Sequence, residues 1–287
     1  MVKRLAYAML LLFLAAASGD GAHGGAPSKG KSGDRDIVIV CPVDRETFQV
    51  SDQSRPSGET ERNDNFGYFL PLYTCPRCGL TLPLVFFESF ADGRAQQKLT
   101  DKLSPYIHSE EFKTLFRSAP PYYVFMRTME EMDPKALDNN PPQLFFLGFG
   151  YASAVRQAEG NPIFGNSLPP NPEYVALSLK KCRERVAEGI KQLENNDEIA
   201  HNFPSLVLRG IYTGVNANRR LGDFGQAGDM LAVYRKYAER FKKEKNLWPT
   251  DEEFSLADIN AMADRQATLI RKKDSKTKVE TKKSNVN

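Results

Sequence analysis

The chain of 287 residues has few of the residues from which most enzyme sites and disulfide-stapled folds are built. It contains four cysteines, three histidines and one tryptophan. Four cysteines in a chain of this length are too few for a disulfide-stapled miniprotein. His23, His108 and His201 stand far apart, and the chain lacks an H-E-x-x-H motif, a G-x-S-x-G elbow and a Gly-rich phosphate loop. We therefore expect no catalytic residues, no bound organic cofactor and no enzyme activity.

Net charge and long apolar runs are also limited. The formal net charge is +3, which is too small to indicate specific nucleic-acid binding. With 41% hydrophobic and 26% charged residues, the composition is typical of a globular protein of one or two domains. The longest apolar run, Leu5 to Ala17, is shorter than the roughly 20 residues that span a bilayer.

The N-terminal segment is typical of an export signal. Lys3 and Arg4 precede the apolar run, and Ala15-Ala16-Ala17 fits an A-x-A cleavage site before Ser18. We expect residues 1–19 to be a signal peptide and the protein to be periplasmic or extracellular; an uncleaved anchor is the alternative. Residues 20–36, rich in Gly, Ser, Ala and Lys, are expected to form a disordered linker.

The C-terminal residues 272–287 are rich in lysine and are expected to form a disordered basic tail. Such a run is usually solvated, but it can also be attracted weakly to anionic lipid or another polyanion. No aromatic residue interleaves these cations, so base stacking is not expected.

Residues 37–90 carry the pattern of a zinc-ribbon-like cysteine module. A β-branched strand signal, Ile37 to Val40, leads into Cys41-Pro42-Val43-Asp44, and a second turn follows as Cys75-Pro76-Arg77-Cys78-Gly79. Two thiolates separated by two residues can bind one ion, and Gly79 supplies the positive φ that such a turn needs. We expect a structural zinc ion, bound by four residues: Cys41, Asp44, Cys75 and Cys78.

Other readings of this module remain open at the level of sequence. In an oxidising compartment, Cys41 can pair with Cys75 or Cys78, or Cys75 with Cys78. Asp44 can equally be a turn residue that accepts backbone N–H groups. A thioredoxin-like centre is disfavoured, because its C-x-x-C opens a helix whereas Gly79 to Pro83 does not start one cleanly.

From residue 91 to 271 the apolar residues recur with helical spacing. Cys182 lies on the apolar face of one predicted helix and is expected to be in the core. Gly222 and Asp223 are placed to end one helix and cap the next, in a turn that resembles a tetratricopeptide hairpin, although Gly214 is smaller than that pattern expects. The predicted helices cover 101–116 (broken at Pro105), 122–132, 143–158, 172–193 and 250–271, the last beginning with a capping box at Thr250–Glu253.

The order of these parts is similar to an uncharacterised bacterial family, domain of unknown function 2225. The residues that carry the resemblance are Cys41, Pro42, Phe48, Cys75, Pro76, Cys78, Gly79 and, loosely, Phe86 or Phe87. The resemblance implies a mainly α fold, in which a small β zinc-ribbon or rubredoxin-like module precedes an α-helical tetratricopeptide-like hairpin domain. It implies no known reaction.

The sequence therefore predicts an exported, non-catalytic protein that binds a protein or peptide partner. Stacked helix hairpins leave a concave surface that suits an extended partner. Tyr122, Tyr123 and Tyr212 are candidate exposed anchors, although core packing is the commoner role for each. The alternatives are an exported metal-dependent hydrolase and a thiol redox protein.

Overall fold

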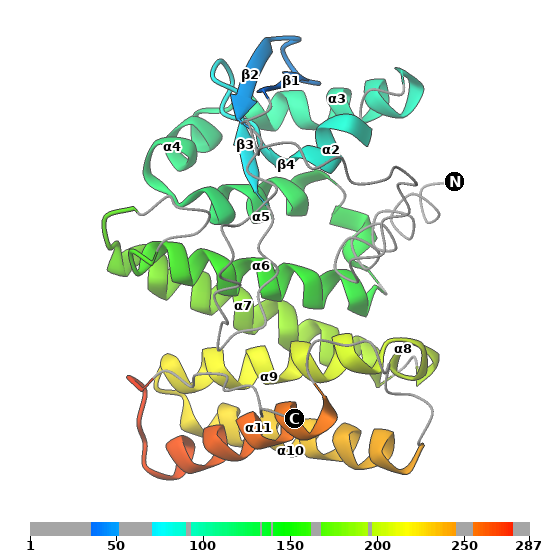
Figure 1. The fold of residues 1–287 in the computed structure, drawn as a ribbon, viewed down its shortest axis with the longest axis vertical. Coiled ribbons are helices and arrows are strands. Elements are labelled where there is room, and N and C mark those ends of the chain that lie inside the picture. The colour runs from blue at the N-terminus through cyan, green and yellow to red at the C-terminus, as the bar shows by residue number, and fades with distance from the viewer. Residues whose placement is uncertain are drawn as a thin grey trace, which may run out of the picture.

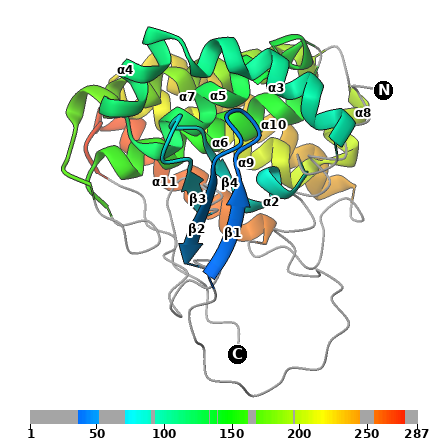
Figure 2. The same ribbon diagram turned by 90° about the horizontal axis from the view of Figure 1, so that it is seen from above.

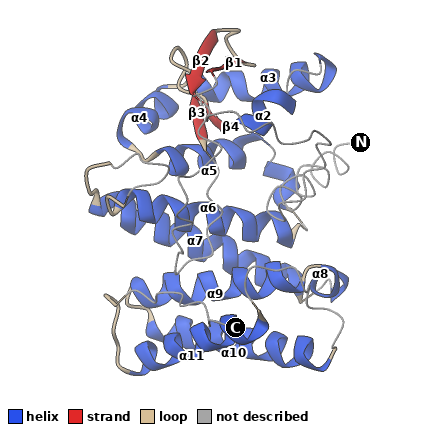
Figure 3. Ribbon diagram, in the orientation of Figure 1, coloured by secondary structure: helices blue, strands red, loops and turns tan. Residues whose placement is uncertain are grey.

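The computed structural model describes residues 36–51, 71–89, 93–132, 134–138, 140–161, 168–194, 197–244 and 255–277. Within these ranges the fold is mainly helical, with a small strand region at its N-terminal end (Figure 1, Figure 3). This confirms the expected fold class at that level. The predicted signal peptide, nearly all of the predicted linker and residues 52–70 between the two cysteine turns lie outside the described residues.

The strands form two separate antiparallel hairpins. β1 (Asp36–Val40) pairs with β2 (Thr47–Ser51), and β3 (Leu72–Thr74) pairs with β4 (Thr81–Pro83). The last pairs before the turns are Val40 with Thr47 and Thr74 with Thr81. Each cysteine turn therefore lies at the closed end of its own hairpin.

Helices follow one another from β4 to the end of the described chain. They stack in successive layers below the hairpins, ending with α10 and α11, while α2, α3 and α4 lie next to the strands (Figure 1, Figure 2). None of the described helices is long and apolar enough to cross a membrane. The bounds are α2 Leu84–Ser89, α3 Gly93–Ile107, α4 Glu110–Ser118, α5 Pro121–Met132, η1 Pro134–Leu137, α6 Pro141–Ala158, α7 Pro172–Leu193, α8 Asp197–Asn202, α9 Pro204–Arg220, α10 Phe224–Lys243 and α11 Leu256–Arg271.

Helical spacing located the central helices well, and its errors lie at helix ends. The helices predicted over 122–132, 143–158 and 172–193 are confirmed as α5, α6 and α7. Helix formation begins earlier than expected, at α2, and Pro105 lies inside α3 instead of breaking the helix. The break comes after Ile107, where Ser109 caps α4 by accepting the Phe112 N–H.

The start predicted for the last helix was wrong. α11 begins at Leu256, and its capping box is formed by Ser255 and Asp258, each side chain accepting from the other's backbone N–H. The predicted box at Thr250–Glu253 lies outside the described residues. Both segments satisfy the capping pattern, and local sequence does not distinguish them.

The hairpin of α9 and α10 has the predicted turn. Gly222 has φ +81°, and Asp223 caps α10 by accepting the Gln226 N–H. Gly214 is small because a Cβ there would lie 2.5 Å from the Val186 side chain. The departure from the tetratricopeptide pattern at this position therefore reflects the close approach of α7 and α9.

The core is continuous from the hairpins to α11. Cys182 is 1% exposed and belongs to it, as predicted. Tyr122, Tyr123 and Tyr212 are also buried, at 2%, 6% and 0% exposure, so they are core residues and not exposed anchors. Each tyrosine lies on a helix with neighbours on several sides, which buries even the polar end of the ring.

A buried carboxylate joins α5 to α7. Glu130 is 4% exposed, and its oxygens accept from Arg127 Nη1 and from Arg185 Nε, each at 2.6 Å, with Lys181 Nζ at 4.0 Å. Burial opposes ionisation, but the hydrogen bond from Arg185 and the three positive charges outweigh it, so the pKa of Glu130 is lowered. The carboxylate is therefore charged and paired in the folded protein.

Arg219 of α9 holds the segment that follows α11. It is fully buried; Nε donates to Gln266 Oε1 at 2.7 Å, Nη1 to the Asp274 carbonyl at 2.6 Å and Nη2 to the Thr277 carbonyl at 2.8 Å. Residues 272–277 of the expected tail are described, and their backbone supplies acceptors that a buried guanidinium requires; the rest of the tail lies outside the described residues.

We expect Glu130→Gln to lower the free energy of unfolding by about 3 kcal/mol at pH 7, because three cations lose a buried partner. Since the folded-state pKa is lowered from 4.5, the stabilisation is complete above pH 4.5 and is lost as the pH falls further. In urea denaturation, the difference in the free energy of unfolding between wild type and Glu130→Gln should be smaller at pH 3 than at pH 7. Glu110→Gln, which removes an exposed partner of Lys113, is the matched control and should change little. An equal difference in the free energy of unfolding between wild type and Glu130→Gln at both pH values would contradict this account.

We expect a chain ending after Lys273 to be less stable than one ending after Lys278 by about 2–4 kcal/mol. Only the shorter chain lacks both carbonyl oxygens that accept from Arg219. Chemical denaturation of the two truncations measures the difference. Equal stability would show that water replaces those acceptors without cost.

Candidate metal centre

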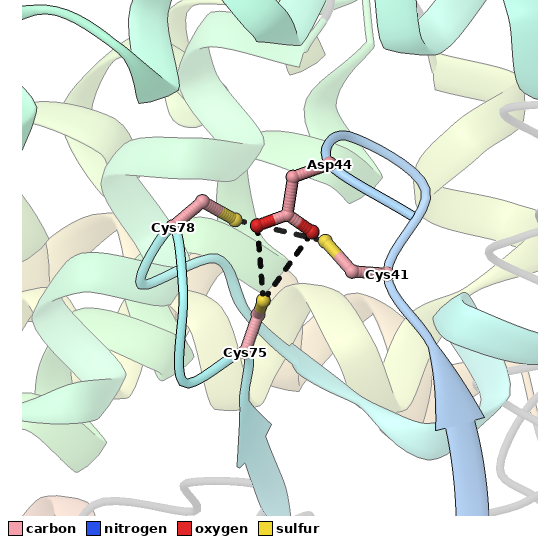
Figure 4. Close-up of side chains that lie close together, drawn as sticks. All are labelled: Cys41, Asp44, Cys75 and Cys78. Carbon is pink, nitrogen blue, oxygen red and sulfur yellow. Dashed lines mark hydrogen bonds between the residues drawn. The ribbon is translucent and has the colours of Figure 1, made fainter. Parts of the chain in front are cut away.

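Four side chains from the two cysteine turns converge on one point. The ligand atoms of Cys41, Asp44, Cys75 and Cys78 all lie within 4.8 Å of one another, and in Figure 4 they point toward a common centre. Cys41 and Cys75 are buried, whereas Asp44 and Cys78 are half-buried. The sequence prediction that these residues come together is confirmed. Within the described ranges, no other group of three or more Cys, His, Asp or Glu side chains is gathered closely enough to bind a metal ion.

The first turn positions Cys41 and Asp44. The Cys41 N–H donates to the Glu46 carbonyl at 2.8 Å, and the Arg45 N–H donates to the Cys41 carbonyl at 3.1 Å. Asp44 Oδ1 accepts the Glu46 N–H at 3.1 Å, which orients the carboxylate. The turn reading of Asp44 is therefore correct, and it is compatible with a ligand role because a carboxylate has two oxygens.

The second turn repeats this geometry. The Cys75 N–H donates to the Leu80 carbonyl at 2.9 Å, and the Gly79 N–H donates to the Cys75 carbonyl at 3.0 Å. Cys78 consequently occupies the position that Asp44 holds in the first turn. The residues one position further on, Arg45 and Gly79, both have positive φ, at 63° and 78°.

The sequence analysis did not predict that Arg45 shares the positive φ of Gly79. Aligning Cys41–Asp44 with Cys75–Cys78 places the two residues at the same position, directly after each segment. A non-glycine residue in the left-handed region is strained by about 1–2 kcal/mol. At Gly79 a side chain would meet a second obstacle, because a Cβ would lie 2.8 Å from Cγ of the Phe116 ring. The first turn tolerates a side chain at this position, whereas α4 closes over the second.

Three distances within the cluster are close to the edges of a tetrahedral metal site. Sulfur atoms bound at about 2.3 Å to a tetrahedral ion lie about 3.8 Å apart, and sulfur and oxygen ligands about 3.5 Å apart. In the structure, Cys41 Sγ lies 3.6 Å from Cys78 Sγ, and Cys75 Sγ lies 3.6 Å from both Asp44 oxygens. The four residues therefore lie close enough to bind a metal ion with three sulfur ligands and one oxygen ligand.

The electrostatics of the cluster depend on shared protons. Burial raises the pKa of Cys75 to about 11, and its thiol donates to Asp44. The pKa of Cys41 is lowered, mainly by its hydrogen bond with Cys78. Burial works against ionisation of Asp44, but the Glu46 N–H and the neighbouring thiols lower its pKa overall. A divalent cation would compensate the negative charge that these groups gather once the thiols lose their protons.

A hydrogen bond and two pairs of aromatic rings connect the cysteine turns and their hairpins with the helices. Thr100 Oγ1 of α3 donates to the Pro42 carbonyl at 2.9 Å. Phe48 of β2 meets Phe87 of α2 edge to face, with centroids 6.0 Å apart. A second such pair of rings, Phe86 and Phe125, joins α2 to α5 at 5.9 Å. The position of the two turns is therefore linked to the packing of the first helices.

The remaining candidate residues lie elsewhere. All four cysteines are free, and Cys182 lies in α7 outside the cluster. His108 is exposed and bonds to Ser104, and His201 is exposed beside Glu244. His23 lies outside the described residues. The C-x-x-C turn leads into β4 and not into a helix, in agreement with the argument against a thioredoxin-like centre.

Comparisons of the chain with protein-family models, with curated proteins and with solved structures find no match. The resemblance to domain of unknown function 2225 remains a prediction from the residues that carry it.

We expect Arg45→Gly to stabilise the protein by about 1 kcal/mol, because glycine removes the strain of the positive φ. Gly79→Ala should destabilise it by about 2 kcal/mol or more, since strain and the Phe116 contact add. Thermal and urea denaturation of the two variants check the signs. If Arg45→Gly lowered the stability as Gly79→Ala does, the positive φ of Arg45 would not be a source of strain.

Proposed function

We propose that the protein is a non-catalytic scaffold for a protein or peptide partner, and that a structural zinc ion holds its N-terminal module together. The observation that carries the proposal is the convergence of Cys41, Asp44, Cys75 and Cys78 from two equivalent turns. Four protein ligands fill a tetrahedral site, so no position remains for water or substrate. This closed arrangement is typical of structural zinc and differs from catalytic zinc, which keeps one open position.

The donor set favours zinc over the other common ions. Three thiolates are soft ligands, which magnesium and calcium do not prefer, and a carboxylate oxygen is an accepted fourth ligand for zinc. Two hairpins that each supply a ligand pair from the turn make the module zinc-ribbon-like. The positions of His108 and His201, both exposed and outside the cluster, add no catalytic group to it.

A structural ion would stabilise the folded state of this module. β3 and β4 have three residues each, and a hairpin so short is not stable alone. Because the two hairpins belong to separate sheets, no backbone ladder joins them. Binding energy at the cluster would become folding energy for the module and would fix it against α2 and α5.

The helical body supports the scaffold part of the proposal. α6 packs on α7 and α9 on α10, as stacked hairpins do, and such stacks offer an extended surface to a partner. The α9–α10 turn resembles a tetratricopeptide hairpin in Gly222 and Asp223. Export through residues 1–19 would place this surface in the periplasm or outside the cell.

We expect the purified full chain to bind one zinc ion, and Cys75→Ser to weaken zinc affinity by more than about 100-fold. Cys182→Ser is the matched control, because it removes a buried thiol outside the cluster and should leave zinc binding intact. Competition with a chromophoric chelator measures the affinity, and elemental analysis gives the stoichiometry. Equal affinities of the two variants would contradict the site.

The non-catalytic and scaffold parts have their own test. A peptide library displayed on phage should yield a sequence that binds the zinc-loaded chain saturably, while ester, peptide and phosphate-ester substrates show no turnover. Zinc-dependent turnover that disappears in Cys75→Ser would favour the hydrolase alternative.

A further inference from the structure

The three thiols of the cluster are not equivalent in the structure. Cys41 Sγ and Cys78 Sγ are in contact across the two turns at 3.6 Å. Cys75 instead directs its thiol to the Asp44 carboxylate, at 3.6 Å from both oxygens (Figure 4). The sulfur atoms of Cys41 and Cys78 therefore meet between the two hairpins, while Cys75 Sγ lies within 4.8 Å of both and is hydrogen-bonded to Asp44.

From this arrangement we propose that Cys41 and Cys78 are a site of oxidative modification, forming a disulfide that replaces the metal ion between the two hairpins. This inference rests on the proposed zinc site, because it concerns what the cluster does when zinc is absent. It also selects one of the three pairings that the sequence left open.

Accessibility sets the order of the steps. Cys78 is half-buried, whereas Cys41 and Cys75 have 0% exposure, so a disulfide from solution reaches Cys78 first. The oxidant is a low-molecular-weight disulfide, RSSR. The Cys78 sulfur attacks one sulfur of RSSR, which forms Cys78–S–S–R, and the displaced RS⁻ takes up the proton that Cys78 loses and leaves as RSH.

Cys41 then completes the reaction. Its sulfur lies 3.6 Å from Cys78 Sγ, and attack on that sulfur forms the Cys41–Cys78 bond and releases the second R group as RSH. Overall, two thiols lose two electrons and two protons, and RSSR gains them as two RSH. The sulfur atoms must approach to about 2.05 Å, which requires small side-chain rotations at the two turns.

Chain entropy disfavours the pairing of Cys75 with Cys78 within one turn. Cys41 and Cys78 are 37 residues apart in sequence, whereas Cys75 and Cys78 enclose only two residues within one turn. A cross-link that closes the longer loop restricts the unfolded chain more and stabilises the fold more. It also joins two hairpins that share no backbone ladder, which the shorter loop cannot do.

The pairing can be identified by mass spectrometry, because trypsin separates the three cysteines. Cleavage after Arg35, Arg45, Arg62, Arg77 and Arg94 leaves Cys41 on peptide 36–45, Cys75 on 63–77 and Cys78 on 78–94. Each possible disulfide therefore gives a linked pair of different mass. The reduced full chain is stripped of metal with a chelator, incubated with oxidised glutathione, alkylated with N-ethylmaleimide and digested without reductant.

We expect linked 36–45 and 78–94 as the main product, with Cys75 and Cys182 alkylated. The oxidised chain should melt about 5 °C or more above the reduced, metal-free chain. Cys75→Ser should form the same cross-link, Cys41→Ser should stop at a glutathione adduct on Cys78, and Cys182→Ser should behave as wild type. Zinc added before the oxidant should slow cross-linking at least tenfold.

The outcomes separate this inference from the zinc proposal. A main product linking Cys75 to Cys78 or to Cys41, or glutathione adducts without any cross-link, would overturn the inference even if zinc binds. A chain that binds no zinc but forms the Cys41–Cys78 bond would overturn the zinc site and leave the modification site standing.

Discussion

The N-terminal part of the fold depends on keeping two short hairpins together at their turns. Each hairpin is a sheet of only two strands, so neither gains stability from a larger sheet. What joins them is a cluster of three thiols and a carboxylate, and such groups repel one another once ionised. Shared protons, a divalent ion or a covalent bond can each remove that repulsion. The chemistry of this part of the chain follows from which of them is present.

The helices benefit from the position of the turns. Phe48 contacts Phe87, and Phe86 on the other side of α2 contacts Phe125 of α5, so displacement of the β1–β2 hairpin disturbs rings that reach α5. The ring of Phe116 lies over Gly79 in the second turn. Aromatic pairs of this kind add stability beyond their buried area. The cysteine module and the helices therefore form one packed unit, which explains the continuous core.

The sequence was most informative where the cause is local. Cysteine spacing predicted the cluster of four side chains, and the apolar period located α5, α6 and α7, because both patterns act within a few residues. The ion pairs of Glu130 and the hydrogen bonds from Arg219 to the C-terminal segment were not predicted, because the partners of these two residues lie on other elements. The predicted start of α11 was wrong because two nearby segments carry the capping pattern, and the helix begins after the second, at Ser255.

Because Asp44 takes the place of a fourth cysteine, the cluster has three thiols that can be oxidised instead of four. With four thiols, oxidation could form two disulfides, and several pairings would compete. With three, one pair oxidises and one thiol remains, so the identity of the pair depends on which thiol is held back. The Asp44 carboxylate accepts from the Cys75 thiol, and the Glu46 N–H orients that carboxylate by donating to Oδ1, so Cys75 has an oxygen partner beside it. In the proposed oxidation, the residue that completes the proposed metal site therefore also favours the Cys41–Cys78 pairing.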